Sequence, residues 1–581
     1  MNRKTLVLPA VVGLLAPVLA ACGASGDGDD GKAAIVVGTT DQFVASKDTP
    51  APLDPAIGYE AGVWNVLRQT VQTLMHVPRG GGQPVPEAAQ SCTFTDTQNE
   101  SYRCKLRSGL KFADGRAVTA DDVKYSIDRV IRINAPNGPV ALLANIDTVE
   151  TQGEREVVFH LRTPDATFPY KLATPVAGIV PRNKYAAKSA RTGFQVDGSG
   201  PYTMKPEVEH NQVVKVVFTR NPHYKGDLKV RNEKVELDVF PDSTAMGKAF
   251  DDKKIDMMTR TMSPEQSQQL LEKPEDGIKL TEIPGLAIHF LGFNTDDPGV
   301  KNKAVRQAMA QVVDRGEIAS KVYGATAEPL YSLIPSGITG HANSFYNKYS
   351  EPSPTKAAAI LEAAGIDTPV KLTLHYPSDR AGAGNAAEFE TLKKQFNDTG
   401  LFDVTVQSSP WAKYRPAQVR GDYAVYGMGW FPDFPDPDNY MAPFLDKNNF
   451  LNSPYRSTLA QKTLIPQSRR EADRSASAKT FERLQDIVAD DVPVLPIWQG
   501  KQYVASREDL TGVEWAVNSS ADLQLWELGD GTVRAPDRFR GRRSGPLTGP
   551  RGAPDRSRRR TPPPVPGRAG RAWSARGRRA S

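Results

Sequence analysis

The sequence contains few of the side chains that most often mark a catalytic or metal site. Its 581 residues include three cysteines, Cys22, Cys92 and Cys104, and seven histidines that stand apart from one another. Two cysteines without a neighbouring histidine cannot complete a zinc site, and the chain has no Gly-x-Ser-x-Gly elbow, His-Glu-x-x-His motif or dinucleotide fingerprint. We therefore expect a protein that binds a ligand without catalysis, metal or cofactor. A secreted hydrolase with an unmarked pair of carboxylates is the rival interpretation.

Positive charge is scarce outside the two ends of the chain. The formal net charge is +6, but residues 531–581 contain 15 Arg, no Lys and 2 Asp, and Arg3 and Lys4 lie at the other end, so residues 22–530 carry a net charge of −9. A nucleic-acid-binding surface needs positive charge on the folded part, so we expect no nucleic acid as a partner. The Arg-, Gly- and Pro-rich segment 529–581 is predicted to be disordered. It is either a basic arm or the product of translation out of frame.

Long apolar runs are missing after the first 20 residues. Thr5 to Ala20 is apolar but interrupted by two prolines, which is too short and too broken for a transmembrane helix and is typical of an export signal. The run ends in Leu19-Ala20-Ala21-Cys22, which resembles a bacterial lipobox. We expect residues 1–22 to be a signal peptide, Cys22 to carry a lipid (palmitate) anchor, and residues 23–32 to form a flexible tether. In an ordinary secretory signal, the alternative, Cys22 would be incidental.

Cys92 and Cys104 are then the only other cysteines, and after export both would lie outside the cytoplasm. An even pair in an oxidising compartment favours a disulfide. The segments around them, residues 91–94 and 102–106, have the pattern of two strands, with residues 95–100 as the turn between them. We therefore expect a disulfide that joins two neighbouring strands.

The body of the chain alternates strand and helix patterns, which predicts an α/β fold. Asp114-Gly115 marks a tight hairpin turn. Thr119 and Asp122 form a capping box before a helix whose apolar face is expected to contain Val123, Ile127, Val130 and Ile131. Further strands are expected at 33–38, 157–161, 213–219, 234–240, 287–294, 371–376, 424–429 and 494–498, and further helices at 303–313, 353–364, 388–396 and 481–489.

The chain resembles the family 5 extracellular solute-binding proteins of ABC transporters, the oligopeptide, dipeptide and nickel group. The block from Leu106 to Arg129 is the most specific, and other blocks follow in the same order through residues 33–528. They are Leu53-Asp-Pro, Gly198-Ser-Gly-Pro-Tyr202, Asn221-Pro-His-Tyr224, Phe293-Asn294, Val305-Arg-Gln-Ala308, Gly429-Trp-Phe-Pro-Asp-Phe-Pro-Asp-Pro437 and Asp486-Ile-Val-Ala-Asp-Asp-Val-Pro493.

The resemblance implies a two-lobed, periplasmic-binding-protein-like fold with a hinge and an extra domain inserted in the first lobe. Mapped on this chain, residues 33–55, 172–284 and 491–528 would form the first lobe, residues 56–171 the inserted domain and residues 285–490 the second lobe. The ligand would be enclosed between the lobes by a hinge motion.

The resemblance also implies an anchor for the ligand. In peptide-binding members, an Asp after a Gly-Trp pair receives the N-terminal ammonium of the ligand, and Asp433 of Gly429-Trp430-Phe431-Pro432-Asp433 matches that position. A carboxylate in a dry cleft is costly unless a cation meets it. Alternatively, Asp433 only caps a Pro-rich turn. The spacing of Asp433, Asp436 and Asp438 is calcium-like, but the intervening prolines and the missing bidentate acid argue against a calcium loop.

The other expected ligand-binding residues surround this position. Trp430 and Trp411 are expected to form walls of side-chain pockets, although both are equally suited to the core, and Phe431 is expected to be a further ligand-binding residue. Gly427 and Gly429 would let the ligand backbone approach their strand. Tyr59 and Trp64 are candidates for the opposite wall.

The resemblance implies an extracytoplasmic, lipid-anchored, monomeric binding protein that captures short peptides and delivers them to an ABC permease with its ATPase subunits. Another solute, such as an oligosaccharide or a metal chelate, is the alternative within the same fold. A receptor module that senses peptides without transport is the alternative outside transport.

Overall fold

The structure is a computed structural model that describes residues 34–46, 49–259, 261–379, 384–447 and 449–530. The expected signal peptide, Cys22, the tether and residues 531–581 lie outside the described residues. The boundary of the expected tail was wrong by two residues, because Gly529–Asp530 forms a strand, β19, that pairs with β18 (Leu510–Thr511).

One eleven-stranded sheet runs through the molecule, in the order β15-β14-β16-β12-β17-β11-β1-β10-β9-β8, with β13 paired to β17. Its strands are β15 (Phe402–Ser409), β14 (Val370–Pro377), β16 (Val425–Trp430), β12 (Ile278–Phe293), β17 (Val494–Arg507), β11 (Met257–Met258), β1 (Ile35–Thr39), β10 (Lys234–Val239), β9 (Gln212–Arg220), β8 (Tyr202–Glu209) and β13 (Ala327–Pro329). The mixture of strands and helices confirms the α/β prediction.

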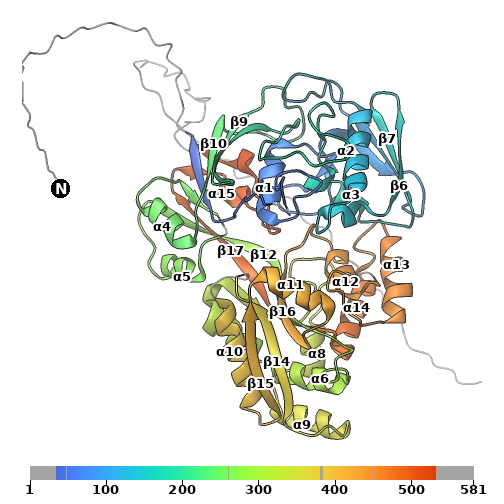
Figure 1. Cartoon of the computed structure of the whole chain (residues 1–581), viewed down its shortest axis with the longest axis vertical. Helices are drawn as coiled ribbons and strands as arrows, with labels where there is room; N and C mark the ends of the chain where they lie inside the picture. Colours follow the sequence, from blue (N-terminus) through green and yellow to red (C-terminus); the bar gives the residue numbers. More distant parts are fainter. Residues whose placement is uncertain (1–33, 47–48, 260, 380–383, 448, 531–581) are drawn as a thin grey trace, which may run out of the picture. The chain divides into compact units, whose positions relative to one another are not determined.

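The long strands β12 and β17 connect the two lobes. They pair antiparallel from Ile278 with Arg507 to Gly292 with Val494, with an irregularity between Pro284 and Ile288. Figure 1 shows them side by side between the β8–β10 region and the β14–β16 region. A Cβ at Gly285 would lie 2.2 Å from the carbonyl oxygen of Gly500, so a side chain would not fit between the two backbones where the pairing is irregular. Both chain crossings between the lobes therefore lie within paired strands.

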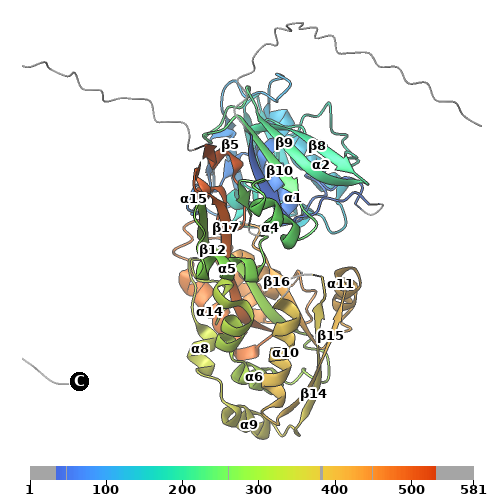
Figure 2. The ribbon, with the colours of Figure 1, turned by 90° about the vertical axis from the view of Figure 1, so that its left-hand side faces the viewer.

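The helices lie between the strands along the chain. They are α1 (Ala61–Thr70), α2 (Ala120–Ile133), α3 (Phe168–Lys171), α4 (Ser243–Asp251), α5 (Pro264–Glu272), α6 (Lys303–Val312), α7 (Arg315–Ile318), α8 (Ser344–Tyr349), α9 (Pro354–Ala363), α10 (Gly384–Asn397), α11 (Trp411–Arg420), α12 (Asp438–Leu445), α13 (Ile465–Arg469), α14 (Ala478–Asp491) and α15 (Val513–Ala516). Figure 2 shows α10 alongside β14 and β15.

The inserted domain has its own sheet, in the order β4-β5-β7-β6. The strands are β4 (Ala89–Phe94), β5 (Ser101–Leu106), β7 (Glu156–Leu161) and β6 (Ile146–Gln152), and a separate hairpin pairs β2 (Met75–His76) with β3 (Val85–Pro86). Cys92 and Cys104 face each other across β4 and β5 and form a disulfide, which confirms the predicted cross-strand bond.

Local sequence signals in the inserted domain account for α2. The carboxylate of Asp122 accepts a hydrogen bond of 3.0 Å from the backbone N–H of Thr119, which satisfies an otherwise unpaired donor at the start of the helix. Val123, Ile127 and Val130 are buried as predicted, but Ile131 is 36% exposed. The prediction for Ile131 was wrong because it lies about 100° around the helix from Val130, outside the buried stripe.

The buried side chains form separate clusters for the two lobes and the inserted domain. The packing differs from the expected boundaries in three places. Helix α1 packs into the first-lobe cluster, residues 172–179 pack into the inserted-domain cluster, and residues 492–497 pack into the second-lobe cluster. Sequence spacing does not show these assignments, because apolar side chains in each segment could pack into either neighbouring cluster.

Among the described residues, no helix combines the length and the apolar character needed to cross a membrane.

Candidate ligand-binding site

The candidate site lies where β16 leaves the sheet. Strand β16 pairs antiparallel with β12, from Phe293 with Val425 to Ile288 with Trp430. Its pairing with β14 is short, Leu374 with Val425 and His375 with Tyr426. The segment from Gly427 to Trp430 therefore extends beyond the recorded pairing with β14, and the chain then turns into the Pro-rich loop that carries Asp433.

Asp433 is half-buried and held by residues from two different parts of the chain. Its Oδ2 accepts a hydrogen bond of 3.1 Å from the hydroxyl of Tyr59 and one of 3.2 Å from Nδ2 of Asn439. The backbone N–H of Asp433 donates to Oδ1 of Asn439 at 2.8 Å. Two hydrogen bonds with Asn439 thus fix both the backbone and the carboxylate of Asp433.

No ion pair joins Asp433 to a basic side chain of the described part of the chain. Burial raises the pKa of Asp433 to about 6, although the hydrogen bonds from Asn439 and Tyr59 and the charge of Lys171 act in the opposite direction. The pKa of Tyr59 is raised well above its ordinary value by burial and by the neighbouring Asp433. The site thus holds a carboxylate that lacks the cation it would need to stay ionised at low cost.

Tyr59 and Trp64 play different parts in the structure. The ring of Tyr59 lies 5.6 Å from that of Trp64, and its hydroxyl reaches Asp433. Trp64 is only 6% exposed, belongs to the first-lobe cluster, and donates its indole N–H to the carbonyl oxygen of Gly58 at 3.0 Å. In this conformation Trp64 packs against Tyr59, and its expected place in a wall of the site stays a prediction.

The two glycines of β16 also differ. Gly427 is buried, and a Cβ there would lie 2.1 Å from the ring of Phe389, so its missing side chain makes room for the core of the second lobe. Gly429 is exposed, and a Cβ there would lie 3.4 Å from the imidazole of His289 and meet no closer atom. Of the two, only Gly429 presents an open surface in this structure.

The aromatic residues that follow point to both core and surface roles. Trp430 is 7% exposed and contacts Phe444 and Phe450, with ring centroids 5.9 Å and 5.1 Å away. Its buried indole N–H has no hydrogen-bond partner among the described residues. Phe431 is 52% exposed, the largest exposed fraction of the described large hydrophobic side chains. Phe431 therefore offers apolar surface two residues from Asp433.

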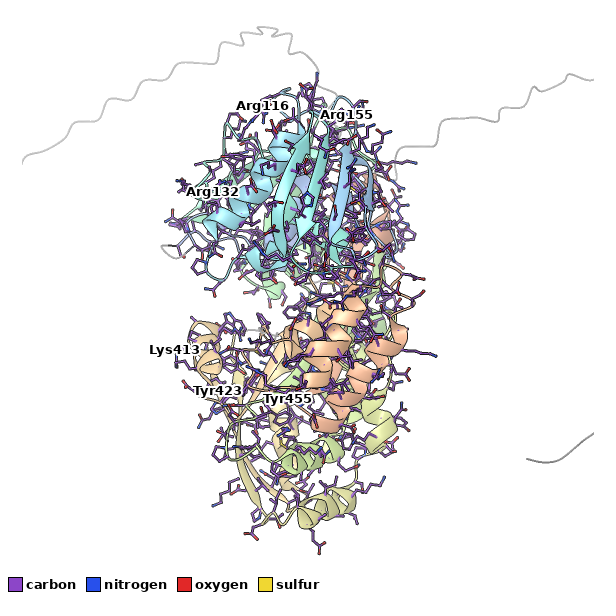
Figure 3. All side chains as sticks on the ribbon, turned by 90° about the vertical axis from the view of Figure 1, so that its right-hand side faces the viewer. Arg116, Arg132, Arg155, Lys413, Tyr423 and Tyr455 are labelled. Carbon is purple, nitrogen blue, oxygen red and sulfur yellow. A yellow bond between two sulfur atoms is a disulfide. The ribbon has the colours of Figure 1, made fainter. Side chains whose placement is uncertain are left out.

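Trp411 begins α11 at some distance along the chain. Its backbone N–H donates to Asp379 at 2.7 Å, and its half-buried ring stacks on Tyr414, which in turn lies 5.2 Å from Tyr423. Figure 3 shows Lys413 of α11 and Tyr423 on the same flank of the second lobe. The recorded contacts do not join Trp411 to Asp433, so its role in the site stays a prediction.

The neighbouring acids Asp436 and Asp438 have structural partners. Asp436 forms an ion pair of 2.7 Å with Arg474, and Asp438 one of 3.2 Å with Arg469. Within the described ranges, no three His, Cys, Asp or Glu side chains are grouped as metal ligands would be. The calcium-like spacing thus reflects two ion pairs that hold the loop.

Asn439 is the site residue that sequence reasoning missed. It lies in the segment Asp438-Asn439-Tyr440 at the start of α12, six residues after Asp433, and is 5% exposed. An Asn in the first turn of a helix usually indicates a cap, and nothing in the sequence shows that its side chain turns back to Asp433.

Comparison with known proteins agrees with this architecture. The family model described as bacterial extracellular solute-binding proteins, family 5 Middle, matches residues 83–452, more than half of the chain. The oligopeptide-binding protein OppA of Bacillus subtilis is 24% identical over 523 residues, which cover 85% of this chain and 94% of that protein.

Two solved structures show the same fold. The murein tripeptide binding protein MppA of Escherichia coli superposes with a TM-score of 0.70 at 22% identity, covering 85% of this chain and 98% of MppA. The binding protein DppA of Helicobacter pylori, in complex with the peptide STSA, superposes with a TM-score of 0.70 at 20% identity, covering 86% and 98%. Both the fold and the matched residues identify the chain: it belongs to the bacterial extracellular solute-binding proteins, family 5.

Proposed function

We propose that this protein is the substrate-binding component of an ABC importer and captures short peptides between its lobes. The state of Asp433 carries the proposal. Burial raises the pKa of this half-buried carboxylate to about 6, and it forms no ion pair within the described residues. The N-terminal ammonium of a peptide supplies the missing cation and up to three hydrogen-bond donors. Binding the ammonium would recover the cost of burying the carboxylate.

The part of β16 after Tyr426, where Gly429 is exposed, supports recognition of the peptide backbone. Pairing of β16 with β14 ends at Tyr426, whereas its pairing with β12 continues to Trp430. An extended peptide can therefore add to this edge as a strand, which reads backbone groups and tolerates many side chains. Gly429 would leave room for a ligand side chain, and Phe431, Trp430 and Trp411 would supply apolar walls.

The relatives support the peptide as ligand. OppA of Bacillus subtilis is named as an oligopeptide-binding protein, MppA as a murein tripeptide binding protein, and DppA of Helicobacter pylori was solved with the peptide STSA. We extend this ligand class to the present chain because Asp433 suits the N-terminal ammonium and the edge of β16 at Gly429 suits the backbone, the two features that all peptides with a free N-terminus share.

The protein would act at the membrane together with the other subunits of a transporter. The lipobox-like Leu19-Ala20-Ala21-Cys22 supports a lipid anchor at Cys22, which would hold a monomer at the extracytoplasmic face of the cell membrane. A permease and its ATPase subunits would take over the peptide and supply the energy, because this chain carries no nucleotide-binding motif. We infer that the protein itself does not transform its ligand.

Isothermal titration of the mature protein with a set of di-, tri- and tetrapeptides tests this function. We expect at least one length class to bind in the micromolar range or more tightly, and we expect the same peptides to be recovered uncleaved. Binding of an oligosaccharide or a metal chelate in place of all peptides would contradict the proposal. Uptake of labelled peptide by a deletion strain, with and without the gene restored, separates transport from sensing.

A further inference from the structure

A buried carboxylate lies in the second lobe close to the candidate site, and the proposed function does not use it. Glu388, on α10, is 0% exposed. Its Oε1 accepts a hydrogen bond of 3.0 Å from Nδ1 of His289. Its Oε2 accepts bonds of 2.6 Å from the hydroxyl of Tyr323 and of 3.1 Å from the indole N–H of Trp498. Among the described residues, the ion-pair partner of Glu388 is His289, and no Lys or Arg takes that place.

His289 presents a nitrogen that the described chain does not use. The side chain is 2% exposed, and its ring stacks on that of Trp498 with centroids 4.9 Å apart. Because Nδ1 donates to Glu388, the neutral ring carries its proton on Nδ1 and its lone pair on Nε2. Nε2 is buried and has no hydrogen-bond partner among the described residues. A buried polar atom is costly to leave unpaired, so Nε2 is suited to a donor supplied by a ligand.

Gly429 leads from the candidate site to the ring of His289. The two residues lie opposite each other in the pairing of β12 with β16, so their side-chain positions share one face of the sheet. Gly429 is exposed, and a Cβ there would lie 3.4 Å from Cδ2 of His289, the ring atom bonded to Nε2. We call the surface over Gly429 that ends at the ring of His289 the Gly429 trough.

The spacing of the strands favours a long ligand side chain in the Gly429 trough. Pairing of β16 with β14 ends at Tyr426, so a peptide added to this edge lies one strand from Gly429 and two strands from His289. Neighbouring strands are about 4.8 Å apart, so roughly 10 Å separate the peptide backbone from that of His289. A short side chain would end above Gly429, whereas the long apolar stem of a Lys or Arg can cross it.

The charge of the network favours a cation at the end of that side chain. The lone pair of Nε2 requires a hydrogen-bond donor, and Glu388 places a negative charge behind the ring. Lys and Arg carry only donors and a positive charge. An acidic side chain in the same place would add a second negative charge and repel Glu388. A basic side chain thus pairs Nε2 and compensates the buried carboxylate at the same time.

We propose that His289 is a specificity-determining residue that binds a basic side chain of the peptide, Lys or Arg, laid across the Gly429 trough. The inference rests on the proposed function and deepens it, because it names the class of peptide that the site prefers. Glu388 is a positioning residue: it fixes the tautomer and the orientation of His289 and does not touch the ligand. A purely structural His289–Glu388 pair would instead affect all peptides alike.

Isothermal titration of the mature protein with matched tripeptides tests the inference. The set contains trialanine, the three peptides in which one alanine is replaced by lysine, and the same three with Nε-acetyl-lysine. Acetylation removes the charge and leaves the stem of the side chain. For the wild-type protein, we expect one lysine position to bind roughly 10–100-fold more tightly than its acetylated counterpart. The other two positions should show little difference, because their charges stay in solvent.

Two substitutions remove the network in different ways. His289→Asn keeps a donor near the position of Nδ1 and removes Nε2, and Glu388→Gln keeps the shape of the side chain and removes its charge. Each folded variant should lose most of the preference for lysine over acetyl-lysine and bind trialanine as wild type does. His341→Asn is the matched control, because Nδ1 of His341 lies 2.7 Å from the carbonyl oxygen of Ile334 in the same lobe. Melting temperatures identify the variants that fold, and either one suffices for the test.

Equal affinity of the wild-type protein for the lysine and acetyl-lysine peptides at all three positions would overturn the inference. A preference that a folded variant retains would also overturn it, and so would an equal loss of affinity for trialanine and for the lysine peptide. Trialanine separates this failure from that of the proposed function. If the wild-type protein binds trialanine without a preference for lysine, only the further inference fails, whereas binding of none of the peptides would end both.

Discussion

The hydroxyl of Tyr59 donates a hydrogen bond of 3.1 Å to Oδ2 of Asp433, which lies 374 residues further along the chain. The bond joins a side chain that packs against the first-lobe cluster to the loop after β16 in the second lobe. A neutral donor on a carboxylate compensates its burial only in part, which agrees with a pKa of about 6 for Asp433. This hydrogen bond places residues of both lobes next to the carboxylate of Asp433.

The raised pKa of Asp433 predicts how ligand affinity changes with pH. In the ligand-free protein, burying ionised Asp433 lowers the free energy of unfolding by about 3 kcal/mol relative to an ordinary Asp. This loss of stability is absent at low pH and grows as the pH rises from about 4 to about 6. A bound ammonium favours the ionised form. Affinity for peptides with a free N-terminus should therefore be constant above pH 6 and fall about tenfold per pH unit below it. Titrations from pH 4.5 to 7 measure this, and a flat profile in the wild-type protein would disprove it.

Asn439 should be nearly as important as Asp433 itself. Asn439→Ala removes the donor to Oδ2 and leaves the backbone N–H of Asp433 without its acceptor. Peptide affinity should fall by about 1–3 kcal/mol, and the pH at which affinity begins to fall should move upward because one hydrogen bond to the carboxylate is lost. Asn449→Ala, which alters a loop contact with Ser453 in the same lobe, is the control. An Asn439 variant with wild-type affinity and pH profile would refute this positioning role.

Gly427 and Gly429 provide a matched pair of substitutions. A methyl at Gly427 would collide with the fully buried ring of Phe389, so Gly427→Ala should lower the stability of the second lobe by about 1–3 kcal/mol. A methyl at Gly429 meets only ordinary contacts, so Gly429→Ala should melt as wild type and lose peptide affinity. Thermal unfolding and titration separate the two effects. Equal melting temperatures for both variants would contradict the packing explanation.

The disulfide should stabilise the inserted domain without contributing to ligand affinity. Cys92 and Cys104 are 12 residues apart, and closing a loop of that size is worth about 3 kcal/mol in the unfolded chain. The double Cys→Ala variant should unfold at a lower temperature in calorimetry and bind peptides within twofold of wild type. Unchanged unfolding would mean that the disulfide does not restrain the domain.

Local patterns in the sequence predicted about half of the strands and a third of the α-helices that the described residues form, and packing over long sequence distances decided the rest. The Thr119–Asp122 cap, the start of α9 at Ser353-Pro354, and the Cys92–Cys104 bond depend on residues close in sequence, and all are present. The outer halves of β12 and β17 were missed, because Pro284, Gly285 and charged residues obscure a strand pattern that pairing between the two strands stabilises.

The candidate site shows the same division. Asp433 was predicted by position in a motif, but its bond to Tyr59 and its fixation by Asn439 depend on how the lobes and the loop fold back. Trp64 was one candidate for the opposite wall of the site, and the structure buries it in the first-lobe cluster beside Tyr59. Aromatic side chains suit both places, so only tertiary contacts distinguish them.

Titration of wild-type protein and Asp433→Asn with one peptide in its free and N-acetylated forms tests the role of Asp433 most directly. The substitution keeps the shape of the side chain and removes its charge. We expect it to weaken binding of the free peptide by about 2–5 kcal/mol and to leave the weaker binding of the acetylated peptide unchanged. An equal loss for both forms, or none for either, would show that Asp433 does not receive the ammonium.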